Sequence, residues 1–304
     1  MEEDFELQER FGIPGVLRFE RKASGLVRAV VSSKAAEAAI YLQGAHIAHW
    51  QPAGQKPVLF LSGKSAFEPG KAIRGGVPIV FPWFGARMAE AGGGRTDGPS
   101  HGFARIEEWK LAFAAMAGED LHLTFTLAPS ELSRSLGYDN FRVAYAVTIG
   151  SSLTMELTVA NDAAKPLNVE EALHTYLAVG DVREVSVTGL EGTTYLDKTD
   201  GMKRKQQPEE PLRFAKTTDQ VHVDTRSACL VQDVANGRVI VVEKRNSDTT
   251  VVWNPWAEAT AALADMEPDA WPGMLCIETA NVGENAVSIA TGESHSMQAK
   301  IMVR

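Results

Sequence analysis

The feature of this sequence that most constrains its fold is a regular alternation of apolar and polar residues. The alternation runs through residues 121–127, 142–149 and 153–159. Because successive side chains of a strand point to opposite faces of a sheet, each segment predicts a strand with one buried face. Further strands are predicted at residues 26–32, 39–43, 57–61, 109–116, 228–232, 239–244, 250–253 and 297–303.

Signals for helices are scarce and are confined to residues 129–137 and 258–264. Many short strands with few helices predict an all-β fold, either a large antiparallel β-sandwich or a barrel. We expect a flexible loop at residues 91–94 and a charged loop at residues 198–211. No repeat or clear linker divides the chain, so we expect a single domain over residues 1–304.

The charge of the chain and its first residues limit its partners. A formal net charge of −9 argues against nucleic acid, because phosphate backbones bind clustered lysines and arginines. A small anionic substrate remains compatible, since two local arginines are enough to bind one. The acidic first residues lack the basic and apolar regions of a signal peptide, and no apolar run is long enough to span a membrane.

Cysteine usage indicates a reducing compartment. Cys229 and Cys276 are too few for a disulfide framework or a thiolate metal site. We expect both thiols to be buried and inert, and the protein to be cytoplasmic.

Residues 73–85 form the segment with the least usual composition. They begin with a cation, pass through two glycines and an apolar run, and end in two aromatic residues and a glycine. Pro78 and Pro82 argue against a buried central strand, because proline donates no hydrogen bond to a sheet. We interpret the segment as an extended edge or loop that places Arg74 and Trp83 along a binding groove. The alternative is an irregular structural connection with a surface arginine.

Two residues are candidates for proton transfer. Ala172, Tyr176 and Ala178 would share the strand face of His174, and the small alanines would leave room for a ligand. Histidine exchanges protons near neutral pH, although a lone histidine is more often a hydrogen-bonded core residue. Glu278 stands in an otherwise apolar strand, where a carboxylate is costly to bury unless it is paired. Its alternative role is a structural ion pair with an arginine.

A third group of candidates lies at residues 99–105, after the glycine-rich segment. The planar guanidinium groups of Arg74 and Arg105 could together bind a phosphate, and His101 could hydrogen-bond a sugar oxygen. The alternative is two unrelated surface arginines. Large aromatic residues could stack on a sugar ring but more often lie in a core. The candidates of this kind are Trp83, Trp253 and Trp256.

Other catalytic chemistries have little support in the sequence. No HExxH or His-x-His pattern occurs, and His46 and His49 are spaced so that they would not share a strand face, so no metal site is predicted. No Gly-x-Ser-x-Gly elbow, P-loop or dinucleotide-binding glycine pattern occurs either. We interpret the histidines outside the candidate site as surface or structural residues. They are His46, His49, His122, His222 and His295.

Five segments are more distinctive together than any of them is alone. They are Arg74-Gly-Gly-Val-Pro through Phe81-Pro-Trp-Phe-Gly, His101-Gly-Phe-Ala-Arg, Ala172-Leu-His-Thr-Tyr, Trp253-Asn-Pro-Trp and Cys276-Ile-Glu-Thr-Ala. In this order they resemble the glucose-6-phosphate 1-epimerases, the hexose-6-phosphate mutarotase branch of the aldose 1-epimerase superfamily. The resemblance runs from about Gly44 to the end of the sequence.

The resemblance implies a large antiparallel β-sandwich in which His174 and Glu278 match the catalytic histidine and glutamate. Arg74 and Arg105 match arginines near the 6-phosphate of the substrate, and His101 matches a histidine of the sugar site. Three further residues complete the substrate-binding candidates. They are Asp219, which resembles a substrate-contacting aspartate, Ser100, which stands where relatives often carry glutamine, and Trp83.

The implied activity is interconversion of the α and β anomers of a hexose 6-phosphate. Glu278 as a carboxylate would accept the proton of the C1 hydroxyl, and protonated His174 would donate one to the ring oxygen. Since neither a redox change nor a second molecule takes part, we expect no cofactor and no metal. We expect a monomer. The alternatives are a non-catalytic carbohydrate-binding protein and an epimerase of unphosphorylated aldoses, and Arg74 with Arg105 argues against the latter.

Overall fold

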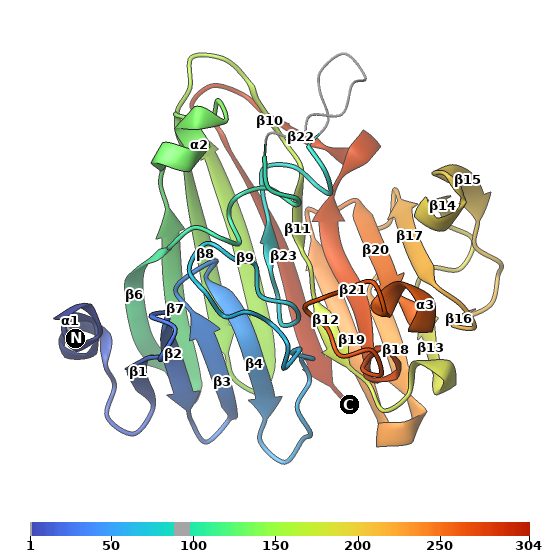
Figure 1. Ribbon diagram of the computed structural model, residues 1–304, viewed down its shortest axis with the longest axis horizontal. Helices are drawn as coiled ribbons and strands as arrows, with labels where there is room; N and C mark the ends of the chain where they lie inside the picture. The colour runs from blue at the N-terminus through green and yellow to red at the C-terminus, as the bar shows by residue number, and fades with distance from the viewer. Residues whose placement is uncertain (1, 88–97) are drawn as a thin grey trace.

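Antiparallel sheets dominate the computed structural model, which describes residues 2–87 and 98–304. A nine-stranded sheet forms one layer, and a four-stranded and an eight-stranded sheet face it (Figure 1). Apolar residues of all three sheets join one core cluster, so the layers form a sandwich. The predicted all-β antiparallel β-sandwich is therefore confirmed, and the single domain stays a prediction. The loop expected at residues 91–94 lies outside the described residues.

The nine-stranded sheet contains most of the strands that the alternation predicts. Its strands are β6 (Lys110–Ala117), β7 (Asp120–Leu127), β8 (Phe141–Ile149), β9 (Ser152–Asn161), β13 (Val185–Thr188), β16 (Leu212–Arg213), β18 (Cys229–Asp233), β19 (Arg238–Arg245) and β23 (Ser294–Val303). Their order is β16-β13-β18-β19-β23-β9-β8-β7-β6. Along β9, half-buried and buried side chains alternate at every position, because one face packs on the core.

The eight-stranded sheet carries the candidate site. Its strands are β5 (Ile79–Val80), β11 (Glu171–Leu173), β12 (Tyr176–Ala178), β14 (Thr194–Asp197), β15 (Lys203–Gln206), β17 (Thr218–Val223), β20 (Thr249–Asn254) and β21 (Met274–Asn281). Strand β21 is central, since it pairs with β20 on one side and with both β11 and β12 on the other. All eight residues of β21 are buried.

The remaining strands and helices complete the chain. The four-stranded sheet consists of β1 (Leu17–Arg21), β2 (Val27–Ser32), β3 (Ala36–Tyr41) and β4 (His46–Pro52), and a small sheet pairs β10 (Leu167–Val169) with β22 (Val287–Ile289). The α-helices are α1 (Glu2–Phe11), α2 (Glu131–Ser135) and α3 (Trp256–Thr260). The 3-10 helices are η1 (Val182–Glu184), η2 (Lys198–Asp200), η3 (Val234–Asn236), η4 (Trp271–Gly273) and η5 (Gly283–Asn285).

Three local predictions need correction. Residues 57–61 form no strand, because the Val58 N–H bonds the Trp50 carbonyl while the Phe60 N–H bonds that of Tyr176, so the segment is shared between two neighbours. Residues 198–211 are not one loop, because they include η2 and the exposed edge strand β15. Helix α1 was not predicted, and α3 begins before the predicted residue 258.

The segment at residues 73–85 is an edge, as predicted. It contributes β5, which ends the order of the eight-stranded sheet. Gly76 has a φ of 62°, and a Cβ at this position would lie 2.2 Å from the carbonyl oxygen of Ile47. The glycine therefore permits a close contact between backbones, which a larger residue would prevent.

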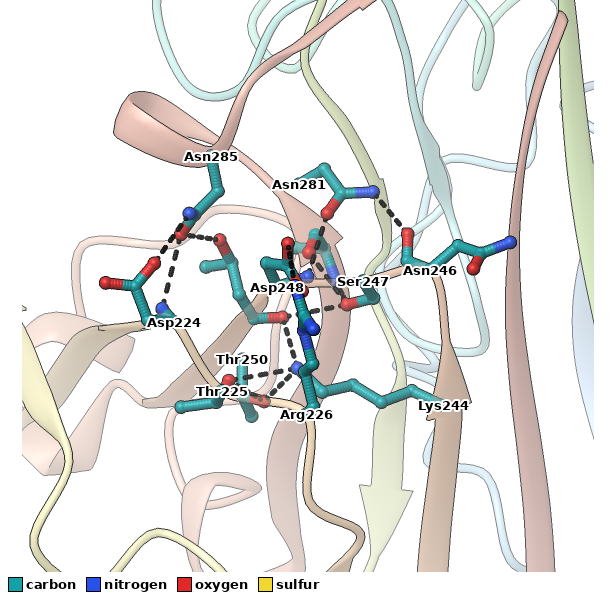
Figure 2. A network of polar contacts seen from close by, with 12 residues as sticks. Asp224, Thr225, Arg226, Lys244, Asn246, Ser247, Asp248, Thr250, Asn281 and Asn285 are labelled. Carbon is teal, nitrogen blue, oxygen red and sulfur yellow. Dashed lines mark hydrogen bonds and ion pairs between the residues drawn. The ribbon is translucent and has the colours of Figure 1, made fainter.

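A polar network links the two layers beside the candidate site (Figure 2). Lys244 of β19 donates hydrogen bonds from Nζ to the hydroxyls of Thr225 and Thr250 at 2.9 and 2.8 Å. The Asn281 side chain donates to the carbonyl oxygen of Asn246 at 2.9 Å. These bonds fix the ends of β20 and β21, the strands that form the floor of the site.

A buried ion pair holds the end of β12. Arg238 Nε lies 3.1 Å from Asp233 Oδ2, and the two side chains are 5% and 0% exposed. The guanidinium also donates to the carbonyl oxygen of Ala178 at 2.7 Å, and the Gly180 N–H donates to Asp233 at 3.0 Å. Strands β18 and β19 are thereby tied to the chain segment that follows β12.

We expect Arg238→Ala to lower the free energy of unfolding by about 3–5 kcal/mol, because the Asp233 charge would stay buried without its partner. Urea unfolding followed by circular dichroism measures the change. Arg142→Ala is the matched control, since Arg142 pairs with Asp162 on the exposed surface and should move the midpoint little. Equal shifts for the two variants would contradict the structural role of the buried pair.

Candidate active site

A cavity of about 150 Å³ opens on the face of the eight-stranded sheet that points away from the main core. Glu278 faces it, whereas the preceding residue of β21, Ile277, points into the core. The wall consists of Arg74, Phe84, His101, His174, Lys198, Asp219, Val251, Trp253 and Glu278. Pockets for drug-sized ligands measure about 300–1,000 Å³, so this cavity favours a smaller molecule. Five of the eight site residues predicted from the sequence thus meet on one wall.

Glu278 comes from the middle of β21 and is 1% exposed. Its face of the strand also carries Cys276 and Ala280, which are small as expected but are fully buried by neighbouring side chains. Oε1 lies 3.4 Å from Nε2 of His174. Oε2 has no hydrogen-bond partner among the described residues. A buried carboxyl group with one free oxygen can exchange a proton with a bound hydroxyl group.

His174 lies between β11 and β12, so the single strand expected around it is interrupted. Because both short strands pair with β21, the interruption leaves His174 opposite Glu278. Its backbone N–H donates to the Pro78 carbonyl oxygen at 3.0 Å. Its ring stacks on Tyr176 with a centroid distance of 4.7 Å and an interplanar angle of 10°. Trp253 meets the ring edge-on at 6.2 Å.

Burial favours the neutral forms of both groups. It lowers the pKa of His174 well below its ordinary value, and the nearby His101 and Arg105 lower it further. Burial raises the pKa of Glu278 well above its ordinary value, and Asp219 raises it further. Both shifts favour the form of the pair in which the imidazole is neutral and the carboxyl group carries the proton. Transfer of that proton across the 3.4 Å between the two groups would give the expected carboxylate and imidazolium.

Two arginines lie beside the tyrosine that stacks on His174. Arg74 donates from one terminal nitrogen to the Tyr176 hydroxyl at 3.1 Å and from Nε to Asp265 Oδ2 at 3.1 Å. Although burial opposes it, Tyr176 and Asp265 raise the pKa of Arg74, which therefore stays charged. Arg105 does not line the cavity itself. It donates to the Ser100 carbonyl oxygen at 2.7 Å, and its Nε has no partner among the described residues.

His101 is a neutral hydrogen-bonding group of the cavity. Burial lowers its pKa to about 3, and Arg105 contributes to the same shift. The Gly85 N–H donates to Nδ1 at 3.2 Å, so the ring proton is on Nε2 and can be donated to a ligand. Phe84 packs edge-on against the ring at 4.8 Å. Glu170 holds Phe84 in place by accepting its backbone N–H at 2.7 Å.

Asp219 and Lys198 form an ion pair on the cavity wall. Lys198 Nζ lies 3.1 Å from Asp219 Oδ2 and 5.3 Å from the centroid of the Phe84 ring. Burial raises the pKa of Asp219, and Lys198 opposes this rise. Lys198 also lowers the pKa of Glu278, against the effect of burial, so it favours the carboxylate form.

Besides Arg105, the structure places two further substrate-binding candidates away from the cavity wall. Trp83 is 6% exposed, donates its indole N–H to the Pro99 carbonyl oxygen at 3.0 Å, and packs against Phe103. Ser100 is exposed, and its backbone is what contacts Arg105. Of the other tryptophans considered, Trp253 lines the cavity, and Trp256 instead packs against Trp271 with a centroid distance of 4.3 Å and an interplanar angle of 39°.

Several residues of the site were not predicted from the sequence. Lys198 was assigned to a charged loop, where nothing in its neighbourhood distinguishes it from other lysines. Tyr176 was expected only to share the strand face of His174. The available sequence signal was its hydroxyl group, because a buried tyrosine hydroxyl usually has a hydrogen-bond partner. Asp265, which anchors Arg74, lies in a turn and had no pattern that singled it out.

An imidazole and a carboxyl group in contact, placed in a small polar cavity beside two arginines, make a site for proton transfer on a small anionic ligand. Together with the antiparallel sandwich, this site defines a class of acid–base enzymes with a sheet-borne active site. A sequence model described as aldose 1-epimerase matches residues 29–301 of the chain. The chain therefore belongs to the aldose 1-epimerase family, and it is an isomerase.

Individual relatives agree with this family. Proteins named "Putative glucose-6-phosphate 1-epimerase" from Escherichia coli (strain K12) and Cenchrus ciliaris are 33% and 31% identical to the chain. The matches cover 87% and 89% of this chain and 86% and 82% of the relatives. The crystal structure titled as a putative mutarotase (YeaD) from Salmonella typhimurium has a TM-score of 0.88 at 29% identity, covering 96% of this chain and 95% of that one.

We expect the imidazole ¹⁵N shifts of His174 in the ligand-free protein to remain those of a neutral ring at pH 7, because its pKa lies well below the ordinary value. His295 is the internal control, since its hydrogen bond to Glu171 raises its pKa and its ring should stay protonated to higher pH. A His174 ring that is charged at pH 7 while His295 behaves as expected would contradict the proposed proton distribution.

Proposed function

We propose that the chain is a glucose-6-phosphate 1-epimerase, which interconverts the α and β anomers of glucose 6-phosphate by opening and reclosing the sugar ring. The observation that carries this proposal is the His174–Glu278 pair, 3.4 Å apart, in a cavity that Arg74 also lines. The names of the relatives support the same substrate.

A local excess of positive charge supports a phosphorylated substrate. Among the described residues, Asp265 is the carboxylate that acts on both Arg74 and Arg105. Two guanidinium groups with one carboxylate leave one positive charge to be balanced, and planar guanidinium groups suit the oxygens of a phosphate. The free Nε of Arg105 supplies a further donor. We propose that the 6-phosphate binds here while C1 lies between His174 and Glu278.

Ring opening requires two proton transfers on one C–O unit. Glu278 as a carboxylate accepts the proton of the C1 hydroxyl while His174 donates a proton to the ring oxygen O5. The C1–O5 bond breaks and a carbonyl forms at C1. Rotation about C1–C2 turns the other face of the carbonyl toward O5, and reclosure reverses both transfers. The pair ends with the proton count with which it began, so the reaction is a net isomerisation.

The substrate helps to produce the reactive protonation state. In the free pair the proton lies on Glu278, and its transfer to His174 creates the carboxylate and the imidazolium together. A bound phosphate would offset the positive charge of the arginines that disfavours the imidazolium. Lys198 stabilises the carboxylate in the same way. We propose that His101 and Asp219 hydrogen-bond the sugar hydroxyls and hold the ring in register.

The rival functions have weaker support. A non-catalytic carbohydrate-binding protein has no use for a buried proton-exchanging pair, whose desolvation is costly. An epimerase of unphosphorylated aldoses has no use for Arg74 beside Arg105. We further propose that the chain is a single domain and a monomer and acts in the cytoplasm. Among the residues that the structure describes, no helix is long and apolar enough to cross a bilayer.

We expect Glu278→Gln to lower enzyme-dependent anomer exchange of glucose 6-phosphate by about 10²–10⁴-fold, because the amide cannot accept the C1 hydroxyl proton. Exchange NMR spectroscopy measures the rate above the spontaneous background. Glu156→Gln is the control, since Glu156 lies on β9 and accepts a hydrogen bond from Gln298 away from the cavity. Full activity of Glu278→Gln would end the assignment.

We expect Arg74→Ala to raise KM for glucose 6-phosphate about 10- to 100-fold, because hydrogen bonds to charged groups contribute about 1.5–3 kcal/mol. The KM for free glucose should change little. The same coupled anomerisation assay measures both sugars. If the variant raises KM for both sugars equally, Arg74 supports the shape of the cavity and does not bind the phosphate.

A further inference from the structure

The stacked rings of His174 and Tyr176 connect the two ends of the site. At one end His174 contacts the proton-exchanging carboxyl group of Glu278 at 3.4 Å. At the other end the Tyr176 hydroxyl accepts a hydrogen bond from Arg74 at 3.1 Å. Between them the rings lie nearly parallel, 4.7 Å apart. The group that donates the proton and the group that binds the anion therefore share one rigid aromatic connection.

Resting on the proposed function, we infer that Tyr176 is a positioning residue through which an anion bound at Arg74 and Arg105 promotes proton transfer by His174. The phosphate of the substrate then contributes to the proton-transfer step as well as to binding. It follows that a free tetrahedral dianion in the same place accelerates the reaction of a sugar that carries no phosphate.

The surroundings of the two rings prevent them from moving independently. The backbone of Tyr176 is bonded on both sides, since its N–H donates to the Gly76 carbonyl oxygen at 2.9 Å and its carbonyl oxygen accepts the Phe60 N–H at 3.0 Å. Trp253 packs edge-on against both rings, at 6.2 Å from His174 and 5.9 Å from Tyr176. A displacement of Tyr176 is thus passed to His174 by direct contact.

The anion end of the connection has unused donors. The Tyr176 hydroxyl accepts a hydrogen bond from Arg74, and its own proton has no acceptor among the described residues. Arg105 Nε is buried and likewise has no partner in the part of the chain that the structure describes. A tetrahedral anion would accept both, and it would fix the direction of the tyrosine hydroxyl and the position of Arg74.

Charge provides a second route for the same coupling. Burial lowers the pKa of His174, and Arg105 and Arg74 lower it further, so both arginines oppose the protonated ring that ring opening requires. A dianion between them offsets this effect. Interactions made with a remote part of a substrate can in this way contribute to the chemical step.

The first test separates the substrate into two pieces. D-xylose is an aldose that lacks C6, and sulfate is a tetrahedral dianion that cannot exchange a proton near pH 7, so it does not itself catalyse ring opening. We expect sulfate to increase enzyme-dependent anomer exchange of xylose about tenfold, within the range of about 5- to 150-fold typical of coupled sites. Sodium chloride at the same ionic strength should have no effect.

The second test uses Tyr176→Phe, which keeps the stacked ring and removes the hydroxyl. We expect kcat for glucose 6-phosphate to fall about tenfold, which is more than the fall in the rate with free glucose, and sulfate activation of xylose to disappear. Tyr145→Phe is the matched control, since Tyr145 is also fully buried and lies in the core on β8. It should leave both rates and the sulfate effect unchanged.

The outcomes distinguish this inference from the proposed function. If glucose 6-phosphate is not turned over by the unaltered protein, the proposed function fails. If it is turned over but sulfate leaves the xylose rate unchanged or lowers it, the coupling fails alone. Equal losses for glucose and glucose 6-phosphate in Tyr176→Phe would show a merely structural tyrosine. Should that variant not fold, the sulfate experiment on the unaltered protein still decides.

Discussion

The contact between His174 and Glu278 depends on the pairing register around β21. Strands β11 and β12 are each three residues long, and both pair with β21. The ladder is interrupted for two residues between them, but both pairings keep one register, and this register places His174 opposite Glu278. A shift of register by one residue would direct Glu278 into the sandwich core, because side chains alternate between the faces of a strand. The active site is therefore a property of strand pairing before it is a property of any loop.

Much of the fold follows from the sequence because alternation is a local property. The alternating segments at 121–127, 142–149 and 153–159 became β7, β8 and β9, and the two prolines correctly indicated an edge for residues 73–85. The candidate acid and base could also be named, since a carboxylate in an apolar strand is rare. Their contact could not be derived from periodicity, because it joins residues about a hundred positions apart. The same limit explains Lys198, which only the antiparallel pairing of β14 with β17 brings to Asp219.

Electrostatics and packing act in opposite directions at this site. Burial disfavours the charged forms of His174 and Glu278, yet the proposed chemistry needs those forms for a moment. Lys198 lies on the carboxylate side and helps to create the charge there. The arginines lie on the imidazole side and oppose it until an anion binds. In the proposed mechanism, the charged pair is disfavoured in the free protein and the bound substrate completes the charge balance.

The complete burial of β21 has a consequence for how the protein loses its structure around Glu278. The strand has neighbours on both edges and is covered on both faces, so it belongs to the part of the molecule that opens last. Peripheral segments can fray, be clipped or exchange their amide hydrogens without disturbing the carboxyl group at its centre. The position of this carboxyl group is therefore lost abruptly, together with the sandwich itself, and not by gradual local opening.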